Sequence, residues 1–174
     1  MKTERLILRR FTLEDYQDLY EYLSQPEVVK YEPYDVFTLE KAKNEAVKRS
    51  VNPAFWAVCL QESGKLIGNI YFEKQDFDTW ELGYVFNLHF QGKGYASEAA
   101  RALINDAFIN QGAHRVVAMC NPENTASWKL MERLNMRREA HHIKNIWFFK
   151  DENRNPIWQD TFEYAILKEE WIKE

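Results

Sequence analysis

The sequence predicts a single α/β domain, spanning residues 1–174, in which helices cover a sheet of antiparallel and parallel strands. Its 174 residues fit one domain of about 100–200 residues. A hydrophobic fraction of 45%, with only 6 glycines and 5 prolines, is typical of a globular protein and not of a disordered or fibrous one. The apolar periodicities follow the order β-α-α-β-β-β-α-β-α-β-β, which combines short antiparallel connections with a β-α-β crossover.

The chain begins with a predicted strand and two predicted helices. Alternating apolar residues over 6–10 predict the first strand. Thr12, with Asp15 three residues later, fits a variant of the capping box, so a helix of about three turns is expected to follow and to end at Pro26. A second, more polar helix is predicted over 38–50.

Strands and one long helix make up most of the remaining chain. Segments 54–61, 66–74 and 79–88 have strand character and short polar turns between them, which predicts an antiparallel meander. The apolar positions between Gly94 and Gln111 fit the helical template. A strand at 114–120, a helix at about 124–134 and a hairpin of 138–150 with 156–167 complete the order.

Charge and hydropathy exclude several classes of protein. The 23 basic and 27 acidic residues give a net charge of −4, which leaves no general basic field for nucleic acid or anionic lipid. The longest apolar run, 54–60, is far shorter than the ~20 residues that span a bilayer. The apolar residues 6–8 are bracketed by Arg5 and Arg9, unlike a secretory signal, so we expect no membrane partner and a cytoplasmic location.

The sequence also indicates no metal or redox centre. Cys59 and Cys120 lie in separate apolar stretches without a Cys-x-x-Cys motif, so both are predicted to be buried thiols. His141 and His142 are adjacent on a predicted strand and face opposite ways, which argues against a paired metal site.

Segment 81–97 carries the chemistry, because a strand there runs through a glycine-bearing loop into the long helix. The first turn of a helix has unpaired N–H groups and a partial positive charge, and Gly92 and Gly94 let the backbone approach a phosphate closely. Lys93 can add a formal charge. Neither the G-x-x-x-x-G-K-[ST] loop of nucleoside triphosphatases nor the G-x-G-x-x-G dinucleotide fingerprint is present.

The string QGKGYA at 91–96 fits the pattern [RQ]-x-x-G-x-[GA] and resembles the acetyl-coenzyme A pyrophosphate loop of the GNAT N-acetyltransferases. Over about residues 4–167 the chain resembles the ribosomal-protein acetyltransferase (RimJ/RimL-like) branch of that family, through TERLILR at 3–9, ELGY at 81–84 and N-x-x-N-x-x-S at 121–127. That branch usually has a proline where this chain has Leu88, and a glycine where it has Asn135. Asparagine can also take the left-handed conformation that ends a helix.

The resemblance implies a mixed, mostly antiparallel sheet of six or seven strands, splayed between the fourth and fifth, with about four flanking helices. It implies acetyl-CoA as the co-substrate and transfer of its acetyl group to a primary amine by direct attack in a ternary complex. The acceptor stays open between a protein N-terminal α-amine and a small molecule, and the oligomeric state between a monomer and a homodimer. A non-catalytic acyl-CoA sensor of the same fold is the alternative.

The resemblance also assigns roles to the residues of the loop and of the strand before it. The pyrophosphate is expected to bind mainly to the backbone N–H groups of Gln91, Gly92, Lys93, Gly94, Tyr95 and Ala96. The backbone of Phe86 and Leu88 is expected to pair with the pantetheine amides, since a splayed strand edge needs partners.

Three further side chains are assigned with an alternative beside each role. Asn124 and Ser127 lie three apart at a helix start and can both face the cofactor, but Asn124 could be a plain N-cap. Ser127 is expected to hold or protonate the leaving thiolate, unless it faces solvent. Glu81 is expected to be the general base, or else one member of a cross-strand ion pair. Tyr84, on the opposite face, is predicted to belong to the core.

The acceptor pocket is expected to lie between the first two helices and the final hairpin. The aromatic residues there line it or merely pack, and they are Tyr31, Tyr34, Trp147 and Trp158.

Overall fold

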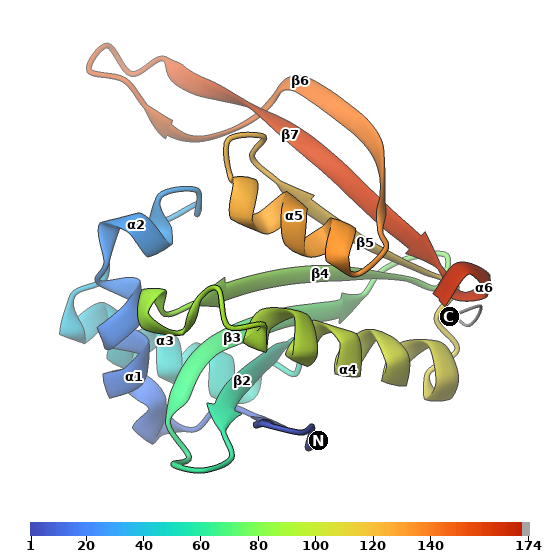
Figure 1. The fold of residues 1–174 in the computed structure, drawn as a ribbon. Helices are drawn as coiled ribbons and strands as arrows, with labels where there is room; N and C mark the ends of the chain where they lie inside the picture. Colours follow the sequence, from blue (N-terminus) through green and yellow to red (C-terminus); the bar gives the residue numbers. More distant parts are fainter. Residues whose placement is uncertain (172–174) are drawn as a thin grey trace.

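Seven strands form one sheet in the order β1-β2-β3-β4-β5-β7-β6 in the computed structural model, which describes residues 1–171 (Figure 1). The strands are β1 (Leu6–Arg9), β2 (Phe55–Leu60), β3 (Leu66–Lys74), β4 (Thr79–Phe86), β5 (Arg115–Cys120), β6 (Arg137–Lys150) and β7 (Pro156–Leu167). Among these residues only β4 and β5 pair in parallel. The mixed, mostly antiparallel sheet is therefore confirmed.

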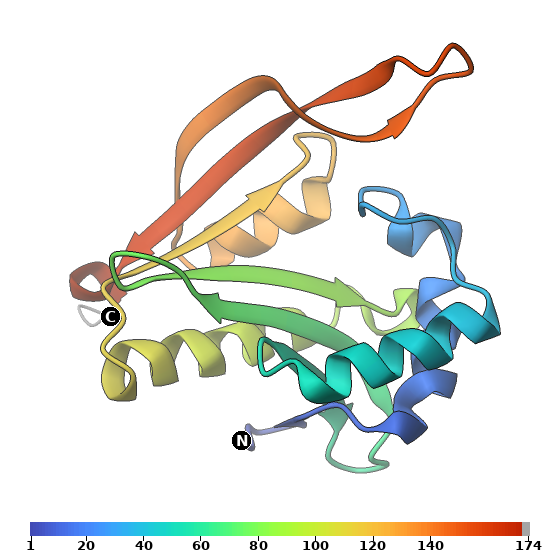
Figure 2. The same ribbon diagram turned by 180° about the vertical axis from the view of Figure 1, so that it is seen from behind.

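Helices cover both faces of this sheet (Figures 1 and 2). They are α1 (Tyr16–Leu23), α2 (Pro26–Val29), α3 (Leu39–Val51), α4 (Tyr95–Asn110), α5 (Thr125–Arg133) and α6 (Lys168–Trp171). Alternation along the strands divides the buried residues into two cores. In β2, Val58 faces the core that α4 and α5 cover, whereas Ala57 and Cys59 face the core that α1 and α3 cover.

The strands β4 and β5 separate before β4 ends. Their register runs from Thr79 opposite Arg115 to Leu82 opposite Ala118, while β4 continues beside β3 as far as Phe86. Figure 1 shows the two strands diverging toward the end of the molecule where α2 and the start of α5 lie. The expected splay between the fourth and fifth strands is confirmed.

The first helix begins later than predicted. Residues Leu13–Asp15 form a 3₁₀ turn, and α1 starts at Tyr16. The Asp15 carboxylate accepts from the backbone N–H of Thr12 at 2.7 Å, as the reach-back bond of a capping box does. Pro26 follows the end of α1, as expected, but it also opens the short helix α2 at a position where its missing N–H costs nothing.

The strand β4 ends at Phe86 and not at residue 88 as predicted. Asn87 follows it, fully buried, and its Oδ1 accepts from the backbone N–H of His89 at 3.1 Å. This bond caps the 3₁₀ turn Leu88–Phe90, so the chain leaves the strand direction one residue after Phe86.

The second half of the chain otherwise agrees with the prediction. Asn135 has a φ of 59° directly after α5, which confirms the left-handed conformation expected there. The short helix α6 is an addition to the predicted order. Within residues 1–171, no helix has the length and apolar character needed to cross a membrane, and no three His, Cys, Asp or Glu side chains are grouped to hold a metal ion.

Candidate active site

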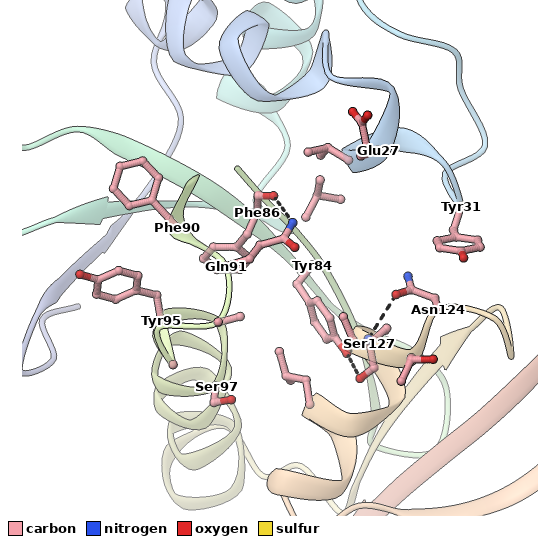
Figure 3. A pocket seen from close by; sticks show the side chains of 18 of the residues that line it. Glu27, Tyr31, Tyr84, Phe86, Phe90, Gln91, Tyr95, Ser97, Asn124 and Ser127 are labelled. Carbon is pink, nitrogen blue, oxygen red and sulfur yellow. Dashed lines mark hydrogen bonds between the residues drawn. The ribbon is translucent and has the colours of Figure 1, made fainter. Parts of the chain in front are cut away.

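Two cavities lie next to each other at the splayed end of β4. The first has a volume of about 670 Å³ and lies between α2, the start of α4 and the start of α5 (Figure 3). The second, of about 340 Å³, lies between β4, β5 and the β6–β7 hairpin. The two cavities share the lining residues Tyr31, Glu32, Tyr84, Asn124 and Ser127. We call these shared residues the junction.

The glycine loop forms one wall of the first cavity. Gly94 is the N-cap of α4 with a φ of 82°, and Gly92 has a φ of 72°, a conformation that L side chains rarely adopt. Tyr95, Ala96 and Ser97 follow as the first residues of α4 and line the same cavity. Their N–H groups have no acceptor within the helix and carry its positive partial charge, so this wall has the chemistry of an anion site.

Arg5 braces the loop from the N-terminal side of β1. Its Nη2 lies 2.7 Å from Oε2 of Glu98 in the first turn of α4, and its Nη1 donates to the Lys93 carbonyl at 3.0 Å. Oε1 of Glu98 also accepts from the Thr3 hydroxyl at 2.6 Å. The partners lie 88 to 95 positions apart, so no local sequence pattern reveals this brace.

The edge of β4 that faces β5 carries unpaired backbone groups at the cavity. The N–H of Asn87 donates to the Ile67 carbonyl of β3 at 2.9 Å. Because alternate residues of a strand present their N–H and C=O groups to opposite sides, those of Tyr84 and the N–H of Phe86 face away from β3 toward the cavity, while the Phe86 carbonyl accepts from Gln91 Nε2 at 2.9 Å. Pairing with β5 has ended at Leu82, so an extended ligand in the splay could pair with these groups.

Three of the predicted cofactor-binding residues are placed differently from the expectation. Gln91 lines the first cavity, but its backbone N–H, expected to bind the pyrophosphate, already donates to the Leu88 carbonyl at 3.3 Å, and its Nε2 donates to the Phe86 carbonyl at 2.9 Å and ties the loop to the strand. Leu88 lies in a 3₁₀ turn and lines neither cavity, so the strand pairing expected for it is wrong. Lys93 also lines neither cavity, and its Nζ lies 5.4 Å from the centroid of the Phe90 ring.

Asn124 and Ser127 bring the start of α5 to the junction. Oδ1 of Asn124 accepts from the backbone N–H of Ser127 at 3.2 Å, so Asn124 is an N-cap as well as a lining residue. Ser127 is only 8% exposed, which excludes the solvent-facing alternative. The Tyr84 hydroxyl donates to the Ser127 carbonyl at 2.9 Å and lies 3.0 Å from its Oγ (Figure 3). Tyr84 is therefore more than the core residue predicted, because its hydroxyl reaches the junction.

Burial keeps two acidic groups near the junction protonated. It raises the pKa of Tyr84 far above its ordinary value, so the hydroxyl retains its proton at neutral pH. It also raises the pKa of Cys120, which lines the second cavity, to about 11. Cys59 is buried as predicted, but Cys120 is only half-buried, which corrects the expectation for that thiol. At neutral pH Cys120 is a weak nucleophile, since the thiolate is the reactive form.

Glu81 lines the second cavity and not the first. Its register partner on β3 is Glu73, another carboxylate, so the cross-strand ion pair weighed as its alternative is wrong. Gln75 donates to Glu81 from Nε2 at 3.3 Å. Burial, and after it the charge of Glu73, raises the pKa of Glu81 above its ordinary value, which makes Glu81 a better proton acceptor than an exposed glutamate.

Comparison with known proteins agrees with this geometry. A family model described as "Acetyltransferase (GNAT) domain" matches residues 5–137. The chain is 42% identical over 171 residues, 97% of each chain, to the uncharacterized N-acetyltransferase YnaD of Bacillus subtilis (strain 168). It superposes on the crystal structure of a GNAT-family acetyltransferase from Bacillus anthracis with a TM-score of 0.89 and 40% identity, over 98% of this chain and 99% of that one. The ribosomal-protein-S5-alanine acetyltransferase of Vibrio fischeri, at 22% identity and a TM-score of 0.77 over 98% and 97% of the two chains, shares the fold.

Proposed function

The chain belongs to the GNAT acetyltransferase family, and on this premise we propose that it transfers the acetyl group of acetyl-CoA to a primary amine by direct attack. The observation that carries the proposal is the junction, where a cavity with an anion-binding wall meets a second cavity lined by Glu81. The acceptor is the N-terminal α-amine of a protein, as in the RimJ/RimL-like branch, or a small amine.

The residues of the first cavity fit acetyl-CoA. A pyrophosphate needs N–H donors and positive potential, which the first turn of α4 after Gly94 supplies. Amide groups need an extended partner, which the β4 edge at Tyr84 and Phe86 supplies beyond the end of the β4–β5 pairing. A volume of about 670 Å³ accommodates an elongated ligand that runs from α4 to the junction.

Acetyl-CoA supplies an activated acetyl thioester, and side chains lining the two cavities transfer the protons. An acceptor that arrives as an ammonium ion loses two protons as its nitrogen–carbon bond forms. Glu81, directly or through a water, accepts them in turn from the nitrogen and passes them to solvent. The carbon–sulfur bond breaks, and the sulfur takes one proton from the Ser127 hydroxyl. Ser127 regains that proton from solvent through the Tyr84 hydroxyl, which lies 3.0 Å from its Oγ and ends the step protonated again. One proton is released to solvent in the balance.

Direct attack is favoured over an acetyl-enzyme intermediate by the state of Cys120. This thiol lines the second cavity and is the side chain there that could form an acetyl-cysteine. A pKa of about 11 leaves only about one part in ten thousand as thiolate at pH 7. The amine acceptor therefore meets the thioester without a covalent enzyme intermediate.

The proposal is tested by release of free CoA from acetyl-CoA in the presence of a panel of primary amines and peptides with free N-termini. We expect thiol release with at least one acceptor, and thermal stabilisation by acetyl-CoA but not by ATP or NAD, because only acetyl-CoA offers both a diphosphate and an amide arm. Stabilisation by acetyl-CoA without turnover would favour the acyl-CoA sensor. Equal stabilisation by ATP would contradict both.

A further inference from the structure

Glu32 lies at the junction, where the function proposed above places the reacting amine. The segment after α2 carries it, and its backbone N–H donates to the Val29 carbonyl at 2.9 Å. The neighbouring Tyr31 hydroxyl donates to the Glu123 carbonyl, ahead of α5, at 3.3 Å. This bond holds the segment against the opposite wall, and Figure 3 shows the Tyr31 ring facing Asn124 there. Glu32 is thus fixed between the two cavities.

Glu32 is the one carboxylate among the junction residues. The other four offer phenol, amide and hydroxyl groups, and Glu81 lines the second cavity alone. A cation that enters the junction from the second cavity therefore finds one negatively charged junction side chain, that of Glu32.

The second cavity as a whole suits a cation. Its charged lining residues within the described part of the chain are three acids and no base, and they are Glu32, Glu81 and Asp160. Asp160 already accepts from the backbone N–H of Lys144 at 2.8 Å and lies 2.9 Å from Nε2 of His141. Glu81 faces Glu73 and serves the proton transfer proposed above. Glu32 is the acid that neither arrangement employs.

The surroundings of Glu32 make its charge sensitive to a cation. Burial raises its pKa to about 7, against the opposing effects of the Tyr34 hydroxyl and the Arg49 guanidinium. Arg49 is itself 3% exposed and pairs with Glu45 at 2.8 Å. Its positive charge therefore offsets only part of the effect of burial on the pKa of Glu32. The other ionisable groups lining the two cavities around Glu32 are Glu27, Tyr31, Glu81, Tyr84, Tyr95, Cys120, Glu123, Arg133 and Asp160.

We propose that Glu32 binds the ammonium group of the acceptor at the junction, so that this enzyme selects acceptors that arrive as cations over neutral molecules of the same shape. The inference rests on the proposed function and adds to it the residue that determines acceptor class. Glu32 binds, and Glu81 removes the proton. An ammonium ion beside Glu32 favours its ionised form, so binding and ionisation reinforce each other.

The test compares benzylamine, a cation at neutral pH, with benzyl alcohol, its neutral isostere, in NMR titrations of the CoA-loaded protein. Wild type is expected to prefer benzylamine by about 10- to 100-fold, the range for one charge-assisted hydrogen bond. Glu32→Gln, which keeps the shape of the side chain, should remove most of that preference and leave the Kd of CoA unchanged. Asp35→Asn is the matched control, because Asp35 is exposed on the same segment and lines neither cavity.

A pH series separates binding by Glu32 from a structural role. The preference for benzylamine should increase as the pH rises through about 7 in wild type and in Asp35→Asn, and should be flat in Glu32→Gln. An unchanged preference in Glu32→Gln, or a loss found in Glu81→Gln and not in Glu32→Gln, overturns the inference. These titrations need no turnover, so an absence of acetyl transfer to every amine would overturn the proposed function while the role of Glu32 in cation binding is still decided.

Discussion

Replacing Gly94 by valine should abolish binding of acetyl-CoA and leave the fold intact. Gly94 has a φ of 82°, where a side chain costs about 1–2 kcal/mol, and an added Cβ lies 3.4 Å from Nη2 of Arg5, against the brace of the loop. Gly112, beyond the other end of α4, has a φ of 72°, and a Cβ there meets no described atom within 4 Å. Gly112→Val therefore reproduces the backbone strain about 24 Å from the loop, at ~1.5 Å per helical residue.

The expected sizes separate strain from lost binding. A cost of about 1–2 kcal/mol lowers the Tm of a domain of this size by roughly 2–8 °C, and it should do so in both variants. Acetyl-CoA at 100 times the wild-type Kd stabilises wild type and Gly112→Val by about 2.7 kcal/mol. A site weakened about 100-fold gains only about 0.4 kcal/mol at the same concentration, so Gly94→Val should show almost no thermal shift.

Differential scanning fluorimetry gives the Tm values, and isothermal titration calorimetry gives Kd for CoA. A wild-type Kd in Gly94→Val would remove the loop from the cofactor site. An equal loss of binding in Gly112→Val would attribute the effect to general destabilisation of the domain and would refute the argument from the loop.

Three substitutions and one pH series test the proposed chemistry. Glu81→Gln should lower kcat by about 10²–10⁴-fold with an unchanged Kd for acetyl-CoA. Raising the pH from about 7 to about 9 should recover part of the rate of this variant, because more of the amine is then neutral. If the variant has the wild-type kcat across that range, Glu81 has a structural role only. Since burial and Glu73 raise the pKa of Glu81, acidification should reduce the wild-type kcat at a pH above the ordinary glutamate value of about 4.3. Tyr84→Phe should lower kcat while costing only about 0.5–1.5 kcal/mol of stability per hydrogen bond lost, and unchanged kcat would remove Tyr84 from proton transfer. Cys120→Ala should retain kcat in steady-state assays, and inactivation would favour an acetyl-cysteine intermediate.

Local patterns predicted the elements that depend on neighbours in the chain. The α4 helix follows from its apolar spacing, and the left-handed Asn135 follows from the conformations that asparagine tolerates. Gly92 and Gly94 of the loop have positive φ values, a conformation that glycine adopts without a steric cost. The misplacement of Leu88 has a local cause as well, because the side chain of Asn87 turns the chain away from the strand by capping the next turn.

The rest of the site depends on contacts between distant segments. Arg5 and Glu98 meet only after β1 has packed beside the start of α4. Glu32 belongs to no sequence motif, and it lines both cavities because its segment is held against the residues ahead of α5 by the bond from Tyr31 to the Glu123 carbonyl. Tyr84 has the same alternating position as a core aromatic, and only the arrival of Ser127 on α5 gives its hydroxyl a partner. Sequence periodicity describes which face a residue occupies and not what lies opposite it.

The shortness of the β4–β5 ladder has a consequence for the order of events in catalysis. Four registered residue pairs join the half of the sheet that contains β1–β4 to the half that contains β5–β7. Hydrogen exchange should therefore be faster at the amides of Tyr84 and Phe86 than at Val85, which faces β3. A bound pantetheine arm would act as a temporary strand that makes the sheet continuous. The β4–β5 wall of the second cavity would become rigid when the cofactor binds. We therefore expect the cofactor to bind first and the amine second.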